Sequence, residues 1–311
     1  MNDTLIPPSS ETAGSSAMPA IEQPSRREAY LELTKMRISV MVLFTFAVPA
    51  ILEAGSDLNI LVLLSAMAGM LLLACSGNAM NMFIERYTDF LMPRTSNRPL
   101  PAGRLSATEV ATFGAVTLGA SLAILLACTN WQTVACGVAN WVLYVFIYTP
   151  LKRHHWINTE VGAVAGALPV LMGSLATTGT VGVIGWSLFA VLIFWQFPHF
   201  MAIAWKYRHQ YEKGGLKMLT VVDPSGLRAG RKSVITAVLL IVSSLVPVVV
   251  LPSIWHIVLF SLVALALGWP YLKASIVFAR DRNDKTARSL MLSSLLYLPL
   301  YMLALVIACW T

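Results

Sequence analysis

The sequence predicts an all-α, polytopic membrane protein, a bundle of nine transmembrane helices. Of its 311 residues, 57% are hydrophobic and only 12% are charged, whereas soluble domains average about 25% charged residues. The charged residues are also gathered into short segments, which leaves long uncharged runs between them. This composition excludes a soluble globular protein.

Uncharged runs of about 20 residues mark the spans, because that length of helix crosses the hydrocarbon core. Single spans are predicted at 38–54, 58–77 and 290–310. Three longer runs lie between them: one between Glu109 and Lys152 with a break at 129–132, one between Glu160 and Trp205 with a break at 177–180, and one between Lys232 and Lys273 with a break at 252–253. Each break contains polar residues or proline, which end helices. Each long run is therefore a pair of helices.

The basic residues give this bundle an orientation. All 22 Lys and Arg residues precede the first span or fall in alternate loops, so they share one face. Basic loops stay on the cytoplasmic side during insertion. We therefore expect a multi-pass protein of the cell inner membrane with a cytoplasmic N-terminus. Residues 1–29 are rich in Ser, Pro, Ala and Glu, which predicts a disordered cytoplasmic tail before a single domain at 30–311.

The end of the second span carries the strongest candidate site. Asn81, Glu85 and Asp89 follow one another at intervals of four, so they share a helix face over about 12 Å. Mg²⁺ commonly takes one or two carboxylates from a protein and completes its shell with water and phosphate oxygens. This face therefore predicts a magnesium site for a diphosphate substrate, in a cavity that faces the cytoplasm.

The loop after this helix supplies opposite charge. Arg94, Arg98 and Arg104 all lie in the segment 92–104, and guanidinium groups match the geometry of phosphate oxygens. The alternative is an ordinary solvated, positively charged loop with ion pairs along the helix. The position of this loop at the mouth of a span favours a functional role.

Two other segments at the same face hold chemically capable residues. In the segment after the sixth span, Pro198 is expected to bend or open its helix, and His199 either packs or touches substrate. Between the fourth and fifth spans, Lys152 and Arg153 are either interfacial anchors or phosphate contacts. Small residues at Gly162 and Gly166 permit close helix contact in lipid.

Taken together, these segments resemble a known family. Residues 81–99 resemble the first aspartate-rich motif of UbiA-like prenyltransferases. Three further segments are similar to those of the protohaem IX farnesyltransferases, also called haem O synthases: 33–37, 148–173, and 195–200 leading to 214–219. The resemblance covers residues 30–311.

This resemblance implies an activity. The family transfers the farnesyl group of farnesyl diphosphate to the 2-vinyl group of haem B, with addition of water, and the haem O that results serves terminal oxidases. The implied cofactor is Mg²⁺. The implied partners are the two substrates, the lipid bilayer, and haem A synthase or terminal oxidase assembly factors, with no nucleic acid.

The resemblance also assigns roles to residues. Asn81, Glu85 and Asp89 are expected to hold Mg²⁺, with Glu212 as a candidate further ligand. Together with Arg94 and Arg98, these three form the expected catalytic set. The residues expected to contact the diphosphate or the haem are Lys35, Arg37, Tyr148, Lys152, Arg153, Asn158, Gln196, His199 and Tyr211.

The sequence departs from the family pattern at three positions. Glu85 stands where the superfamily usually has Asp, Met36 replaces a common Pro, and Gln210 replaces the Asp that commonly precedes Tyr211. Two alternative functions remain open at this point. One is a UbiA-like prenyltransferase that acts on a quinone precursor or another aromatic acceptor. The other is a membrane haem carrier or transporter, although transporters usually bind substrate near the midplane.

Overall fold

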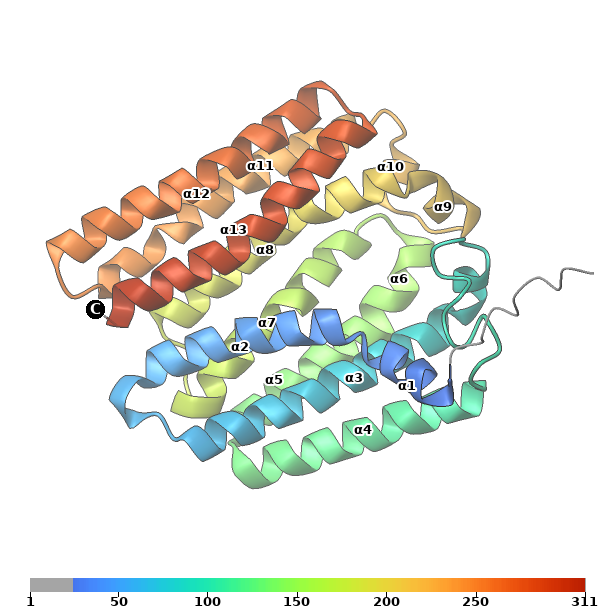
Figure 1. The fold of residues 1–311 in the computed structure, drawn as a ribbon, viewed down its shortest axis with the longest axis horizontal. Coiled ribbons are helices and arrows are strands. Elements are labelled where there is room, and N and C mark those ends of the chain that lie inside the picture. Colours follow the sequence, from blue (N-terminus) through green and yellow to red (C-terminus); the bar gives the residue numbers. More distant parts are fainter. Residues whose placement is uncertain (1–24, 311) are drawn as a thin grey trace, which may run out of the picture.

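A computed structural model of the chain describes residues 25–310, and this part is built from helices alone (Figure 1). Within it, nine helical segments are long and apolar enough to cross a membrane. The predicted nine-span architecture is therefore confirmed for the described residues, and the chain is a multi-pass membrane protein.

The helices follow one another with short connections. In chain order they are α1 (Arg26–Thr34), α2 (Met36–Ala54), η1 (Gly55–Asp57), α3 (Ile60–Phe90), α4 (Ala107–Cys128), α5 (Trp131–Val142), η2 (Leu143–Tyr148), α6 (Thr149–His154), α7 (Asn158–Thr178), α8 (Val183–Lys206), α9 (Arg208–Lys213), α10 (Leu219–Val222), α11 (Leu227–Ser244), η3 (Val246–Val250), α12 (Ile254–Arg280) and α13 (Asp284–Trp310).

The first helix begins earlier than the sequence predicts. Ser25 accepts a hydrogen bond from the Glu28 backbone, and the Glu28 carboxylate accepts one from the Ser25 backbone. This capping box satisfies backbone N–H groups at the start of a helix. Residues 26–29 therefore belong to α1 and not to the predicted tail, and the rest of that prediction concerns residues 1–24, outside the described range.

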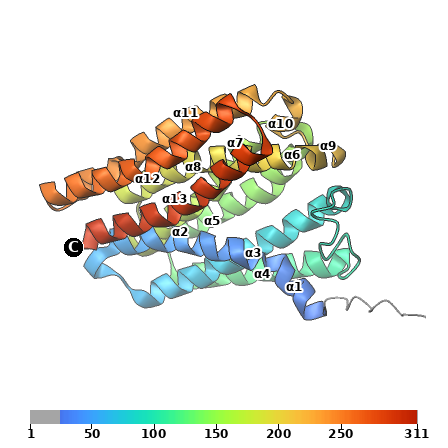
Figure 2. The same ribbon diagram turned by 45° about the horizontal axis from the view of Figure 1, so that its top comes forward.

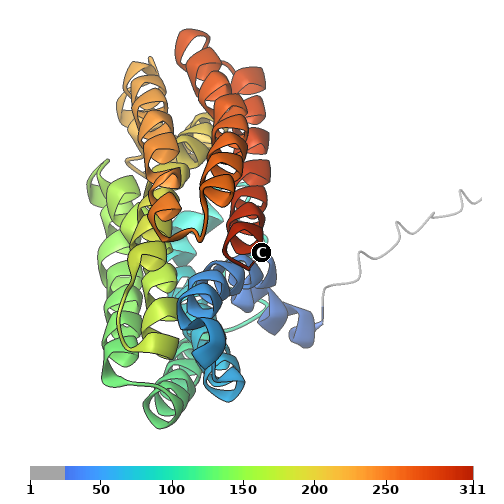
Figure 3. The ribbon, with the colours of Figure 1, turned by 90° about the vertical axis from the view of Figure 1, so that its left-hand side faces the viewer.

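The helices form two groups, which separate clearly when the bundle is turned (Figure 3). One buried cluster joins α2, α3, α4 and α7 through side chains such as Phe46, Met70, Leu125 and Met172. A second joins α8, α11, α12 and α13, with Leu188, Phe260 and Tyr301 among its members. Helices α7 and α8 connect the two groups.

Glycines allow the closest contacts between helices. A Cβ at Gly166 would collide with the Gln196 amide of α8, and one at Gly162 would lie 2.6 Å from the Tyr148 ring. The predicted role of these two glycines in close packing is confirmed. A Cβ at Gly173 would meet the carbonyl oxygen of Phe46, a backbone atom of α2 that cannot turn aside.

The two ends of the bundle differ. The loops with the basic residues gather at one end, where α1, α6 and α9 also lie (Figures 1 and 2). We call this the basic end. At the opposite end, the Glu53 carboxylate of α2 accepts a hydrogen bond of 2.7 Å from Gly185 N, in the first turn of α8. This contact caps a helix whose own N-cap residue, Gly182, has no side chain to do so.

We predict that Gly173→Ala destabilises the protein, by about 1–3 kcal/mol, because the added methyl group has no room beside the α2 backbone. The midpoint of thermal unfolding in detergent measures this. Gly119→Ala is the matched control, since a Cβ there meets nothing within 4 Å. Equal midpoints for Gly173→Ala and the wild type would contradict the packing described.

Candidate active site

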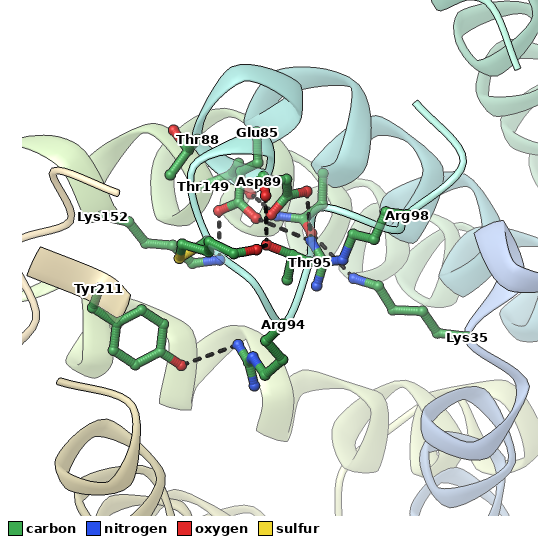
Figure 4. Close-up of polar contacts among 12 residues, drawn as sticks. Lys35, Glu85, Thr88, Asp89, Arg94, Thr95, Arg98, Thr149, Lys152 and Tyr211 are labelled. Atoms are coloured by element: carbon green, nitrogen blue, oxygen red, sulfur yellow. Dashed lines mark hydrogen bonds and ion pairs between the residues drawn. The ribbon is translucent and has the colours of Figure 1, made fainter. Parts of the chain in front are cut away.

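The last turns of α3 bury three oxygen-bearing side chains at the basic end. Asn81, Glu85 and Asp89 are only 2%, 7% and 0% exposed, and their spacing of four puts them on one face of the helix, as predicted. Figure 4 shows Glu85 and Asp89 next to each other. Helix α3 continues without a break from the span to Phe90, which holds these side chains in line. The loop 91–106, the junction of α1 and α2, and α6 surround them.

Each of these side chains has a cationic partner. Lys152 Nζ lies 2.7 Å from Glu85 Oε1, and Arg98 Nη1 lies 2.6 Å from Asp89 Oδ2 and 3.9 Å from Glu85 Oε2. Lys35 Nζ donates to Asn81 Oδ1 over 3.1 Å. Three cations thus surround two carboxylates, and the excess positive charge favours an anionic ligand. We call these six residues the charged cluster.

Lys35 reaches this cluster from an unusual backbone conformation. It separates α1 from α2 with φ 46° and ψ 50°, and it is the only described residue other than glycine with a positive φ. The left-handed region costs a non-glycine residue about 1–2 kcal/mol. Strain of this kind often accompanies functional sites, and here it lets the lysine leave one helix and reach Asn81.

The cluster fits a hard cation that has few protein ligands. Asp89 Oδ1 is buried and has no hydrogen-bond partner, so one carboxylate oxygen is free beside Asn81 and Glu85. No group of three or more His, Cys, Asp or Glu side chains in residues 25–310 is placed to hold a metal. Two carboxylates, one amide oxygen, and the remaining positions filled by water or phosphate form a donor set that Mg²⁺ accepts.

Glu212 does not join this donor set. Its side chain is 72% exposed and faces His209, whose Nδ1 is 4.0 Å from Glu212 Oε2. The structure therefore does not bring Glu212 together with the three other expected ligands. Helix α9 is only six residues long, and it directs Tyr211 inward and Glu212 outward.

Arg94 joins the loop 91–106 to the segment that contains α9. Its Nη2 donates to the Tyr211 hydroxyl over 3.3 Å, its backbone N–H donates to Gln210 Oε1, and its guanidinium lies 4.5 Å from the centre of the Tyr207 ring. Burial raises the pKa of Tyr211 although Arg94 opposes the shift. The phenol is therefore protonated at neutral pH and keeps both a donor and an acceptor site. Gln210, where the family commonly has an acid, serves here in loop docking.

Helix α6 and the η2 turn before it bring two further predicted residues to the cluster. Arg153 Nη2 donates to Thr88 Oγ1, and the Tyr148 ring lies 4.4 Å from Lys152 Nζ. The backbone of α6 is tied to the loop between α9 and α10, because Lys217 N donates to Lys152 O over 2.7 Å. Contacts between loops therefore place Lys152 beside Glu85.

Four other predicted residues have different surroundings. Arg37 is exposed in the first turn of α2, at a surface hollow of about 840 Å³ that Lys35 also lines. Asn158 donates to His155 O and Lys217 O, which holds two loops together. Gln196 donates to Ala163 O of α7. His199 lies 2.7 Å from Ser294 Oγ and stacks on Trp195, so its contacts are those of the packing interpretation.

Several residues of the site escaped sequence reasoning. Thr88, Thr95 and Thr149 all place hydroxyl groups at the charged cluster, where Thr95 Oγ1 donates to Asp89 O over 2.9 Å and Thr149 contacts Asn81. Thr88 is three residues from Glu85, so helical spacing could have found it. No pattern marks Thr149, which arrives from a distant helix.

Comparison with solved structures supports the fold. The structure described as "Structural and mechanistic insights into the biosynthesis of Digeranylgeranylglyceryl phosphate synthase in membranes" superposes with a TM-score of 0.76 over 91% of this chain and 98% of that one, at 17% identity. A UbiA homolog from Archaeoglobus fulgidus bound to GPP and Mg²⁺ gives 0.68 over 89% and 99%, at 16% identity. At such low identity these similarities concern the fold alone.

Comparison of sequences is more specific. The model of the UbiA prenyltransferase family matches residues 41–298. The protein named "Protoheme IX farnesyltransferase" from Rhodopirellula baltica is 41% identical over 281 residues, which cover 88% of this chain and 98% of that protein. A protein of the same name from Solibacter usitatus is 38% identical over 87% of this chain and 95% of its own length. This chain therefore belongs to the UbiA prenyltransferase family.

Proposed function

We propose that this prenyltransferase is a protohaem IX farnesyltransferase, which makes haem O from farnesyl diphosphate, haem B and water. The charged cluster carries the diphosphate half of this proposal, because its excess positive charge and its free carboxylate oxygen suit a magnesium diphosphate. The acceptor half rests on relatives of that name, which are 41% and 38% identical over most of the chain.

In this mechanism the chain's own cations bind the leaving group. Lys35, Arg98 and Lys152 exchange their contacts with Asn81, Asp89 and Glu85 for oxygens of the diphosphate, and Arg94 donates from the neighbouring loop. As the allylic C–O bond breaks, negative charge accumulates on the diphosphate, and cations already in position stabilise that charge without reorganisation. Mg²⁺ held by Asn81, Glu85 and Asp89 would add positive charge at the same oxygens.

The farnesyl cation left behind needs an apolar, water-poor chamber. Tyr148 and Tyr144 stack with ring centres 5.7 Å apart beside Lys152, and aromatic faces stabilise cations. The cation bonds to the terminal carbon of the vinyl group, water adds to the carbocation formed on the haem side chain, and one proton leaves. Diphosphate is the second product, so atoms and charge balance.

The arrangement of the basic residues supports an orientation. We propose that the basic end faces the cytoplasm of a cell whose inner membrane holds the protein, as the positive-inside rule requires. Farnesyl diphosphate, a charged soluble headgroup on a lipid-like chain, would then enter from that side. The haem O formed would pass to terminal oxidases, directly or through haem A synthase.

The same cluster would serve a prenyltransferase with a quinone precursor as acceptor. The acceptor is therefore what the first experiment must decide. We predict that the chain restores haem O in a strain that lacks haem O synthase, with extracted haems identified by chromatography and mass. Absence of haem O despite good membrane expression would reject the haem acceptor, and a prenylated quinone precursor in the same extract would identify the alternative.

We predict that Glu85→Gln and Asp89→Asn each lower haem O formation by two orders of magnitude or more, because each removes a charge that a magnesium diphosphate needs. The amount of haem O per amount of membrane-inserted protein measures this. Asp284→Asn is the matched control, since this carboxylate lies at the same end but is 69% exposed and pairs with Arg208. Wild-type activity in either cluster variant would refute the proposed metal ligands.

We predict that the protein binds the metal tightly only together with diphosphate. Lys152 and Arg98 already occupy Glu85 and Asp89, and a dication added alone would raise the positive charge of the cluster. Mn²⁺ titration followed by electron paramagnetic resonance should show at least ten-fold tighter binding with pyrophosphate present, after correction by the same titration without protein.

Lys152→Met frees the Glu85 carboxylate, so it should strengthen the binding of Mn²⁺ alone. Lys273 is an exposed lysine of α12, and the control substitution Lys273→Met should leave the affinity for Mn²⁺ alone unchanged. Equal Mn²⁺ affinities with and without pyrophosphate would contradict the exchange of cations that the mechanism requires.

A further inference from the structure

A buried hydroxyl group lies against the amide of Asn81. Thr149 is 1% exposed, and its Oγ1 lies 3.1 Å from Asn81 Nδ2 and 2.8 Å from Tyr144 O. We propose that Thr149 is a positioning residue, which turns the Asn81 amide so that its oxygen is offered to the metal of the diphosphate. This inference rests on the proposed function but does not depend on the acceptor.

The direction of three consecutive hydrogen bonds supports this role. A backbone carbonyl can only accept, so the Thr149 hydroxyl must donate to Tyr144 O and must accept from its other neighbour. That neighbour is therefore the NH₂ group of Asn81. At the other end, the Lys35 ammonium can only donate, so it contacts the amide oxygen, 3.1 Å away. Both ends of this series of hydrogen bonds thus give the amide the same orientation.

The carbonyl that starts this series of hydrogen bonds lies in a π-helical turn. Residues Leu143–Tyr148 form this turn, and the Thr149 N–H bonds to Tyr144 O across it. Tyr144 O therefore accepts both the backbone N–H and the side-chain hydroxyl of Thr149. Turns of this kind inside α-helices frequently mark functional sites.

Orientation matters because the two ends of an amide are not equivalent. The oxygen has lone pairs and can bind a hard cation, whereas the nitrogen carries two hydrogens and cannot. A rotated amide would also place its NH₂ group against the Lys35 ammonium. When Lys35 turns to the diphosphate, the oxygen it leaves is free to bind the metal. Thr149 therefore acts on the metal through Asn81, without touching it.

Thr149→Val removes the hydroxyl and preserves the shape of the side chain, and Thr149→Ser keeps the hydroxyl. The probe is Mn²⁺ with pyrophosphate, measured by electron paramagnetic resonance on the purified full chain in detergent. We expect Thr149→Val to weaken Mn²⁺ binding by about 10–100-fold, the usual effect of losing a partner that orients a metal ligand. Thr149→Ser should bind within a few-fold of wild type.

Thr117→Val is the matched control. Thr117 is also a buried threonine, but its hydroxyl donates only to carbonyls of its own helix, Phe113 O and Gly114 O. Its Mn²⁺ affinity should equal that of the wild type. If Thr149→Val does not fold, Thr149→Ala replaces it, because alanine lacks the hydroxyl and adds no new atoms.

Two further readouts separate positioning from a purely structural role. In Thr149→Val the Mg²⁺ concentration for half-maximal activity should rise, while the rate at saturating Mg²⁺ is largely kept. In an Asn81→Ala background, Thr149→Val should change Mn²⁺ affinity no further, because both substitutions act on one amide. Wild-type Mn²⁺ affinity in folded Thr149→Val, or equal loss in the serine and valine variants, would overturn the proposal. The Mn²⁺ binding measurements do not require haem, so a wrong acceptor would leave them unaffected.

Discussion

The structure depends on the neutralisation of charge that is buried at the boundary of a membrane. Two carboxylates within the last turns of a transmembrane helix cannot remain ionised in an apolar bundle without partners, because desolvation of a charge costs several kcal/mol even after relaxation of the protein. Arg98 and Lys152 supply these partners, and Lys35 adds a third cation through its contact with Asn81, so that three separate segments meet here. The charged cluster is thus both the candidate catalytic apparatus and the contact that gathers the loops of the basic end.

Each cation reaches the cluster through a specific piece of backbone. Lys35 does so by a left-handed residue between two helices, and Lys152 by a short helix that follows a π-helical turn. The loop with Arg98 is held by the Thr95 hydroxyl and by the apolar side chain of Met92, which packs against Tyr211 and Leu216. The cations keep their places because backbone and apolar contacts hold the segments that carry them. An incoming diphosphate can therefore replace the carboxylates as their partner without unfolding the loops.

Sequence patterns predicted what depends on local periodicity. The nine spans and the shared face of Asn81, Glu85 and Asp89 follow from hydropathy and helical spacing, and the structure reproduces them. Contacts between distant segments were not predictable in this way. The docking of Arg94 on Tyr211, the link of Thr149 to Asn81 and the outward direction of Glu212 depend on how loops meet, which no repeat in the chain encodes. Gln196 and His199 stood out in the sequence for their chemistry, yet their contacts hold α8 against α7 and α13.

The Glu53 cap at the far end of the bundle has a mechanical consequence. It ties α2 of one helix group to the first turn of α8 in the other, where a carboxylate also opposes the positive end of the helix dipole. The basic end is fastened as well, because the Lys217 N–H donates to Lys152 O and Arg94 donates to Tyr211. The two helix groups are thus joined at both faces of the membrane, which keeps them in register with each other.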